Sequence, residues 1–554
     1  MVRVRTVSTT LYRGGAVLTA EVLAARVAEP LRRTVPAGDP LDDAPTALLV
    51  ADGAVAWVGR ADEADGLVDG ADEVVDLDGA LVTPGFVDAH AHVLDTGLRL
   101  ASVDLHGARD LGEVLDRVHA AVSGPAGRAA AAAGDPLCGY GWDEHTWPER
   151  RGPRRAELDA VGQGAPVYLG RADLHAGVVS TSFAQVLGLP ELPGWREDGL
   201  VTGPAHLAAR RAVLDVAPQR RDALEAAALA AAARAGLVAV HEQSAPHLGS
   251  RAGLAALLAG TADPASGLPL VVGYRAELCE TVDDVRELLA AVPGLTGVGG
   301  DLAVDGSLGS RTAALRAPYA DAPTDWAHPD GRLDLTAEEV TNHVAAATRA
   351  GVQAAFHVIG DRATDEVLLG FRVAGDLEGV DAVRAAGHRL EHAPMLDAPA
   401  LATMVLLGLT ASVQPAFDAA WGGDDGLYAA RLGRGRAASL HPLADLRAGG
   451  VPLALGSDSP VTPFDPWGAV RAAVAHRTPD QRIPVRAAVS AHTRGGWRAA
   501  GAGESRAGLL EVGAPAHLAV WRTGGGLPQL VEDAPAPRCV RTVRAGVVLH
   551  DELG

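Results

Sequence analysis

Residues 82–92 read VTPGFVDAHAH, a short apolar strand pattern with a Pro-Gly turn signal at its start and two histidines at its end. Side chains alternate between the two faces of a strand, so His90 and His92 share one face. Two imidazoles at one strand end are candidate ligands for zinc, iron, nickel or copper. A bare His-x-His pattern is more often a pair of surface histidines, but the Pro-Gly-Phe-Val-Asp lead-in and the residues downstream favour a metal site.

Composition and charge limit the classes of protein. With 554 residues, 48% hydrophobic and 21% charged, the chain is expected to be a soluble globular protein of more than one compact domain. The net charge of −21 argues against nucleic acid or an anionic membrane as a partner. No apolar run is long enough for a membrane span, the first residues lack a signal-peptide pattern, and three scattered cysteines give no disulfide framework. A cytoplasmic location is therefore expected.

All 48 basic residues are arginine, and the sequence contains no lysine. This absence excludes a Schiff-base lysine, a P-loop lysine and a carbamylated lysine.

The middle of the chain alternates strand and helix patterns, as parallel α/β sheets and barrels do. Ten strand candidates are at 86–91, 137–142, 166–171, 237–242, 269–275, 301–305, 352–358, 388–393, 409–415 and 452–457. A TIM-type (β/α)8 barrel needs eight. We therefore predict a barrel over 84–507, with an insertion at about 100–215, after barrel strand one, that carries the strands at 137–142 and 166–171. Residues 1–83 and 508–554 read as short strands and turns, and we expect them to form one small β-sandwich domain.

Polar residues recur where the predicted barrel strands end. Catalytic groups of such barrels lie at the carboxyl ends of the strands. The residues at these positions are His90, His92, His241, His357, His392 and Asp458. A coincidence of unrelated strand-end residues is a poor explanation for the whole set.

The order His-x-His, His, His, Asp on strands one, five, six and eight resembles the amidohydrolase superfamily. The segments DGSLGSRTA at 305–313, HVIGDRA at 357–363, RLEHA at 389–393 and GSDSP at 456–460 resemble the branch that contains N-substituted formamide deformylase. The resemblance covers nearly the whole chain, including the return into the β-sandwich at 509–520. It implies a divalent metal, with zinc as the expected ion, and it says little about the substrate.

The chain departs from the family pattern at Asp301. Many binuclear members have a carboxylated lysine four residues before the aspartate that begins the DGSLGS motif, where this chain has Asp301. Two arrangements remain open. Asp301 lies between two metals, or one metal is held by His90, His92, His357 and Asp458 with His392 near the substrate. The second is slightly preferred, with Asp301 kept as a possible ligand.

Hydrolysis of an amide at neutral pH requires an activated water, and a metal-bound water has a pKa of roughly 7. Asp458 is predicted to accept the proton of that water and return it to the leaving nitrogen. His392 is a further catalytic candidate, and His241 and Arg311 are candidate donors to the oxyanion, although Arg311 also suits a salt bridge with Asp305 or Asp361. The candidate substrate contacts are Trp142, Asp173, His175, Asp305 and Gln414, each of which also suits simple packing or hydrogen bonding.

These observations predict a metal-dependent hydrolase that cleaves a non-peptide carbon–nitrogen bond in a small amide or formamide. One alternative is a deaminase, although the HVIGD segment lacks the further His and Glu that deaminases commonly carry near strand five. Another is a non-catalytic binding protein on the same barrel. Homo-oligomer formation is expected only from the family resemblance.

Overall fold

The computed structural model describes residues 9–24, 41, 44–322, 327–502, 505–523, 526–528, 530–531 and 536–553. At its centre is an eight-stranded parallel sheet, nearly closed into a barrel, in the order β19-β18-β17-β16-β15-β14-β13-β7. The strands are β7 (Phe86–Ala91), β13 (Leu237–Ser244), β14 (Leu270–Arg275), β15 (Leu295–Val298), β16 (Gln353–Val358), β17 (Arg389–His392), β18 (Thr410–Val413) and β19 (Leu453–Leu455). A bridge between Ala91 and Ser459 links the two ends of the sheet. The predicted TIM-type α/β fold is confirmed.

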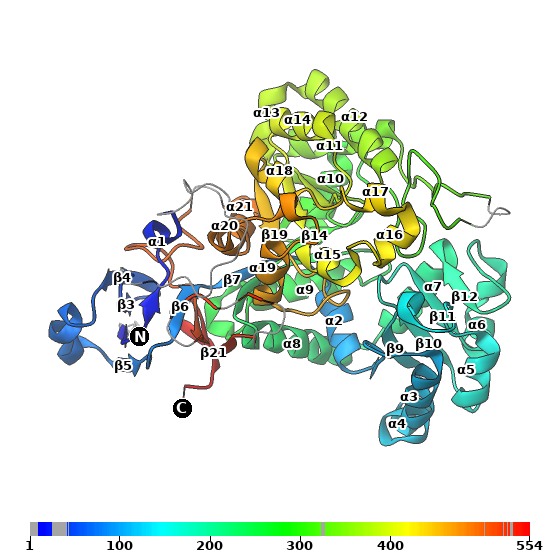
Figure 1. Cartoon of the computed structure of the whole chain (residues 1–554), viewed down its shortest axis with the longest axis horizontal. Helices are drawn as coiled ribbons and strands as arrows, with labels where there is room; N and C mark the ends of the chain where they lie inside the picture. The colour runs from blue at the N-terminus through cyan, green and yellow to red at the C-terminus, as the bar shows by residue number, and fades with distance from the viewer. Residues whose placement is uncertain are drawn as a thin grey trace.

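Helices surround this sheet and bury its outer face (Figure 1). They are α8 (Pro218–Arg234), α9 (Arg251–Ala262), α10 (Val282–Ala291), α11 (Ala337–Ala350), α12 (Asp361–Glu378), α13 (Val380–Ala386), α14 (Ala398–Leu407), α18 (Leu443–Gly449), α19 (Pro466–Val474), α20 (Val485–Ala491) and α21 (Arg494–Ala499). Three short helices, α15 (Pro415–Trp421), α16 (Leu427–Leu432) and α17 (Arg434–Ala437), follow β18. None of the helices in the described ranges is long and apolar enough to span a membrane.

The predicted fourth barrel strand at 301–305 is wrong, because the strand is β15, which ends at Val298. Gly299 and Gly300 follow with φ of 88° and 70°, a left-handed backbone that ends the strand. A Cβ on Gly299 would lie 2.1 Å from the carbonyl oxygen of Ala355, so the chain approaches β16 too closely for a side chain. Asp301 therefore lies just beyond the end of the strand.

The segment after β7 carries a second sheet, in the order β12-β11-β10-β9-β8. It is introduced by α2 (Val93–Leu100), and its strands are β8 (Val103–Asp104), β9 (Leu137–Trp142), β10 (Val167–Arg171), β11 (Ala176–Val179) and β12 (Leu200–Thr202). Its helices are α3 (Leu111–Ser123), α4 (Pro125–Ala133), α5 (Arg155–Gly162), α6 (Thr181–Leu187) and α7 (Gly203–Leu214). Figure 1 shows this region in cyan on one side of the barrel, away from both chain ends.

Strands from both chain ends lie side by side on the opposite side of the barrel (Figure 1). One sheet has the order β4-β3-β1-β5, and the other has the order β2-β6-β20-β21-β22. Their strands are β1 (Thr9–Arg13), β2 (Ala16–Val17), β3 (Ala47–Ala51), β4 (Ala54–Gly59), β5 (Glu73–Asp76), β6 (Leu81–Pro84), β20 (Leu518–Arg522), β21 (Arg538–Arg544) and β22 (Val547–Asp551). Side chains of both sheets share one buried cluster, for example Leu48 with Val520. The β-sandwich assignment and the domain boundaries stay predictions.

Candidate metal centre

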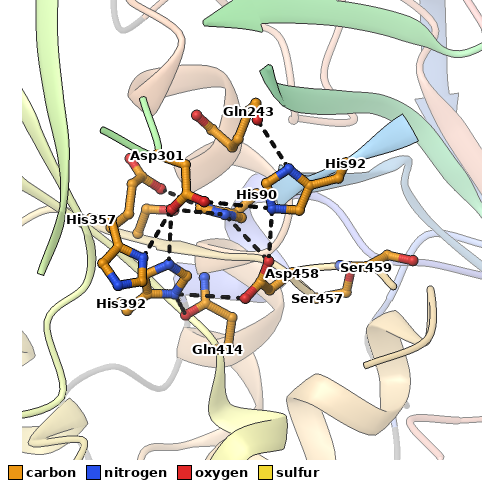
Figure 2. A network of polar contacts seen from close by, with 12 residues as sticks. His90, His92, Gln243, Asp301, His357, His392, Gln414, Ser457, Asp458 and Ser459 are labelled. Carbon is orange, nitrogen blue, oxygen red and sulfur yellow. Dashed lines mark hydrogen bonds and ion pairs between the residues drawn. The ribbon is translucent and has the colours of Figure 1, made fainter. Parts of the chain in front are cut away.

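Six side chains converge at the carboxyl edge of the barrel (Figure 2). The parallel strands all end at this edge, so residues far apart in sequence meet there. His90 lies on β7 and His92 directly follows it, His357 lies on β16, His392 ends β17, and Asp301 and Asp458 each follow a strand by three residues. These are the six residues that the sequence singled out as candidate metal ligands.

Asp301 lies between two pairs of histidines. Its Oδ1 is 3.1 Å from His357 Nδ1 and 3.3 Å from His392 Nε2. The same carboxylate lies 3.7 Å from His90 Nε2, through Oδ1, and 3.6 Å from His92 Nε2, through Oδ2. One carboxylate thus faces both pairs, as a group shared between two metal positions would.

Asp458 faces the first of these pairs. Its Oδ1 is 3.4 Å from His90 Nε2 and 3.3 Å from His92 Nε2, whereas its Oδ2 is 4.0 Å from His392 Nδ1. His392 and Asp458 have φ of 67° and 55°. Histidine and aspartate adopt this left-handed backbone more readily than most side chains, and such conformations are concentrated at functional sites.

Each of the four imidazoles has one ring nitrogen against a protein oxygen and the other directed at the cluster. Such hydrogen bonds fix the orientation and tautomer of metal-binding histidines. The contacts are His90 Nδ1 to Glu391 Oε2 at 2.8 Å, His92 Nδ1 to the Gln243 carbonyl at 3.0 Å, His392 Nδ1 to Gln414 Oε1 at 2.9 Å, and His357 Nε2 to the Gly306 carbonyl at 3.1 Å. The nitrogens facing the cluster are therefore available as lone-pair donors.

The oxygen that faces His90 belongs to a buried ion pair. Glu391 accepts from Arg389 Nε at 2.6 Å and from Arg389 Nη2 at 2.9 Å, and both side chains are fully buried. Burial opposes the charge of Glu391, but Arg389 and then His90 outweigh it and hold the pKa of this carboxyl at about 2. Glu391 is thus an ionised acceptor for the His90 N–H.

The electrostatics of the cluster fit a divalent cation. Burial acts to raise the pKa of Asp301, but the histidines around it, His357 first, hold that pKa well below the usual range. Burial lowers the pKa of His357, but Asp301 outweighs it and raises that pKa to about 9. His90 Nε2 is buried and has no hydrogen-bond partner among the described residues. Two ionised carboxylates with imidazole nitrogens aimed between them form the oxygen and nitrogen donor set of zinc and similar metals.

A pocket of about 390 Å³ opens over the cluster, and we call it the wide pocket. Its walls come from the insertion, at residues such as Thr202 and Arg210, and from the barrel loops, at residues such as His328. Four further predicted residues line it, namely Asp173, His175, Asp305 and Arg311.

These four side chains differ in whether they are already bound to other protein groups. The His175 ring lies 5.3 Å from the His357 ring, at the edge of the cluster. Asp173 Oδ2 accepts from the hydroxyls of Ser307 and Ser310, each at 2.7 Å. Arg311 pairs with Asp321 and not with the predicted Asp305 or Asp361.

Asp305 serves the backbone. Its carboxylate accepts from the amides of Ala314 at 2.8 Å, Ile359 at 2.9 Å and Gly360 at 2.8 Å, and its side chain is fully buried. The carboxylate is therefore engaged by the backbone, and its role as a substrate contact stays a prediction.

Three other predicted residues lie away from the wide pocket. His241 sits inside β13, fully buried, with Nδ1 2.9 Å from Arg389 Nη1, so it does not reach the cluster as an oxyanion donor. Trp142 is buried in the insertion and donates to the Leu169 carbonyl at 3.2 Å. Gln414 does not line the wide pocket. Its side-chain oxygen contacts His392, a candidate metal ligand, and orients that ring. These three assignments are corrected because the side chains are committed elsewhere.

The sequence analysis did not single out Gln243, and it gave no role to Arg389 and Glu391 of the RLEHA segment. Arg389 and Glu391 share one face of β17. Two charged residues of opposite sign on one face of a buried strand could have indicated an ion pair in the sequence. Gln243 contributes only its backbone carbonyl, which leaves no mark in the sequence.

The chain is similar to known proteins in both sequence and fold. Residues 73–550 match the family model described as "Amidohydrolase family". Protein LONG AFTER FAR-RED 3 of Arabidopsis thaliana is 28% identical over 79% of this chain and 75% of its own length. N-substituted formamide deformylase of Arthrobacter pascens is 26% identical over 86% of this chain and 89% of its own length. The crystal structure of an uncharacterized metal-dependent hydrolase from Pyrococcus horikoshii aligns with a TM-score of 0.67 and 25% identity, covering 93% of this chain and 97% of that one.

Proposed function

The chain belongs to the amidohydrolase family, and from this premise we propose that it hydrolyses a non-peptide carbon–nitrogen bond in a small amide or formamide. The observation that carries the proposal is the cluster in which Asp301 lies between two histidine pairs with Asp458 beside one of them. The similarity of the chain to a metal-dependent hydrolase of the same fold supports a hydrolytic reaction.

We propose two metal positions, in place of the single position that the sequence favoured. His90, His92 and Asp458 would hold one ion, His357 and His392 the other, and Asp301 would bridge them. The reason is that one Asp301 oxygen lies within 3.3 Å of a nitrogen of both His357 and His392, while the carboxylate also faces His90 and His92. Zinc is the proposed metal because the donors are imidazole and carboxylate.

A bound divalent metal supplies an acidified water and polarises the substrate carbonyl. Asp458 is the proposed general base. Burial acts to raise its pKa, but His90 and the other histidines hold that pKa far below the usual range, so the carboxylate is ionised at pH 7. The same carboxyl returns the proton to the leaving nitrogen.

His175 is proposed to contact the substrate. Burial, and then His357, lowers the pKa of His175 to about 4, so the ring is neutral at pH 7 and offers one donor and one acceptor. Its backbone amide donates to Asp173 at 3.4 Å, and Asp173 is paired with Arg171, which also pairs with Asp143.

The test is hydrolysis of a panel of small amides and formamides by protein stripped with a chelator and reloaded with zinc or manganese. Asp458→Asn is expected to reduce the rate by about 10² to 10⁴. Asp365→Asn, at a half-exposed pair with Arg316, is the matched control and should keep wild-type activity. For the N-substituted members of the panel, release of the substituted amine indicates amide hydrolysis, and release of ammonia indicates deamination. No hydrolysis after reloading, or an unchanged rate for Asp458→Asn, would contradict the proposal.

A further inference from the structure

A second, smaller cavity adjoins the cluster, and we call it the inner chamber. It shares His357, His392 and Asp458 with the wide pocket, so a molecule bound at the cluster can extend into either space. Its other wall residues are largely apolar and aromatic, including Leu308, Ile359, Phe417, Trp421 and Tyr428, and the paired Arg171 and Asp173 also line it. A substrate group that enters the inner chamber must therefore lose its hydration shell.

One wall residue of the inner chamber is polar and has no partner. His441 is 3% exposed, and neither of its ring nitrogens has a hydrogen-bond partner among the described residues. Its ring lies 5.8 Å from the Tyr428 ring. Buried polar atoms are nearly always paired, so two orphaned nitrogens on one ring that borders a cavity point to a ligand.

The backbone holds His441 in place. Its amide donates to the Pro394 carbonyl at 2.9 Å, and its own carbonyl accepts from the Leu443 amide at 2.7 Å. Its φ of 54° is a left-handed conformation that histidine and asparagine adopt more readily than most side chains. Burial, and then His476 and His392, lowers the pKa of His441 to about 3, so the ring is neutral, with one donor and one acceptor.

The size of the inner chamber limits what it accepts. Its volume is about 50 Å³, compared with about 390 Å³ for the wide pocket. One water needs about 10–15 Å³ and an enclosed cavity of about 150 Å³ binds benzene, so the inner chamber holds a short chain and not a phenyl ring.

We propose that the inner chamber binds one end of the substrate, a short uncharged aliphatic group whose terminal polar atom hydrogen-bonds to His441. This inference rests on the proposed function for the position of the reacting bond, and it adds the substrate class. The two groups joined by the amide differ in size. A compact group of about two to four carbon atoms lies in the inner chamber, and a bulkier group lies in the wide pocket. A hydroxyl or carbonyl at the end of the short group suits a neutral imidazole.

The test measures binding to the zinc-loaded protein by calorimetry, with hydroxamic acids that attach to the metals and are not turned over. Butyrohydroxamic acid and beta-hydroxypropionohydroxamic acid are matched in length, and a terminal methyl in the first is a hydroxyl in the second. Benzohydroxamic acid is the bulky control. The ratio of affinities within one preparation does not depend on the fraction of folded protein.

His441→Phe keeps a ring and removes both nitrogens. We expect it to reduce the preference for the hydroxyl probe over the methyl probe by about tenfold, the loss of one hydrogen bond. His441→Asn, which tolerates the left-handed backbone and keeps a donor and an acceptor, should retain part of the preference. Benzohydroxamic acid should bind all three proteins alike, because its ring lies in the wide pocket.

The outcomes separate this inference from the proposed function. A ratio that is unchanged in His441→Phe, or an equal effect on benzohydroxamic acid, overturns the role of the inner chamber and leaves the reaction standing. A ratio that depends on His441 in a protein that hydrolyses no amide supports the inner chamber and overturns the reaction. Failure of all three probes to bind overturns both.

Discussion

Replacing Glu391 by glutamine tests whether the buried ion pair beneath the cluster positions His90. Glutamine has the same shape but only one acceptor oxygen and no charge. In the native protein the carboxylate serves both Arg389 and the His90 Nδ1–H, with donor–acceptor distances of 2.6 to 2.9 Å. In Glu391→Gln the amide group must face a donor, and the charge on Arg389 stays buried without a counterion.

Two magnitudes follow. Removing one partner of a buried ion pair costs about 3–5 kcal/mol of the free energy of unfolding. Removing the acceptor behind a metal-binding histidine costs about 10- to 100-fold in metal affinity or activity. Arg389 retains its contact with the Ala89 carbonyl at 2.7 Å, which places the stability loss toward the lower end of that range.

The assay is zinc affinity by competition with a chelating dye, together with urea unfolding of the zinc-loaded protein. Glu552→Gln is the matched control, because Glu552 forms a two-point pair with Arg538 in which the side chains are 36% and 71% exposed. An exposed pair is worth about 0–1 kcal/mol, so the control should change neither quantity much. Zinc affinity in Glu391→Gln within twofold of wild type would refute the positioning role.

Two further predictions concern pH and the backbone. In metal-free protein the pKa of His357 is raised from 6.5 to about 9, where burial is outweighed by Asp301. This contribution to stability is complete below pH 6.5 and is lost as the pH rises through about 9, so calorimetry should show a falling Tm for metal-free protein over that window. The stabilisation by added zinc should grow over the same window because the metal displaces protons, and a rising metal-free Tm would contradict this assignment. Asp305→Asn should lower the free energy of unfolding in urea by about 1–3 kcal/mol, since it weakens an acceptor of three backbone amides, and a change in KM without a stability loss would contradict its structural role.

The barrel and the cluster were predictable because each produces a recognisable pattern in the sequence. Strand and helix patterns alternate, and the polar residues lie where apolar strands end. Asp301 was found by its place before the DGSLGS motif, but it was expected at the start of the fourth barrel strand, whereas it follows the end of that strand by three residues. The DLAVD segment has the alternation of a strand, while the left-handed backbone at Gly299 and Gly300 ends the real strand earlier.

The supporting residues were harder to assign because their roles depend on which neighbour each side chain meets. His241 was predicted at a strand end, but β13 continues to Ser244 and leaves His241 inside the barrel. Gln414 was placed correctly at the end of β18, yet its amide is bound to His392. His441 carries no signal in the sequence, since only the packed structure shows a buried ring without partners beside a cavity.

Metal content per chain, measured by elemental analysis on wild type and Asp301→Ala after equal zinc supplementation, tests directly whether Asp301 lies between two metal ions. Asp334→Ala is the control, because Asp334 lines the wide pocket but pairs with Arg332. We expect about two metals in wild type and in the control, and one or fewer in Asp301→Ala, because that variant lacks the carboxylate that faces both histidine pairs. One metal in all three proteins would contradict the bridging role of Asp301, and no metal in any of them would contradict the metal centre itself.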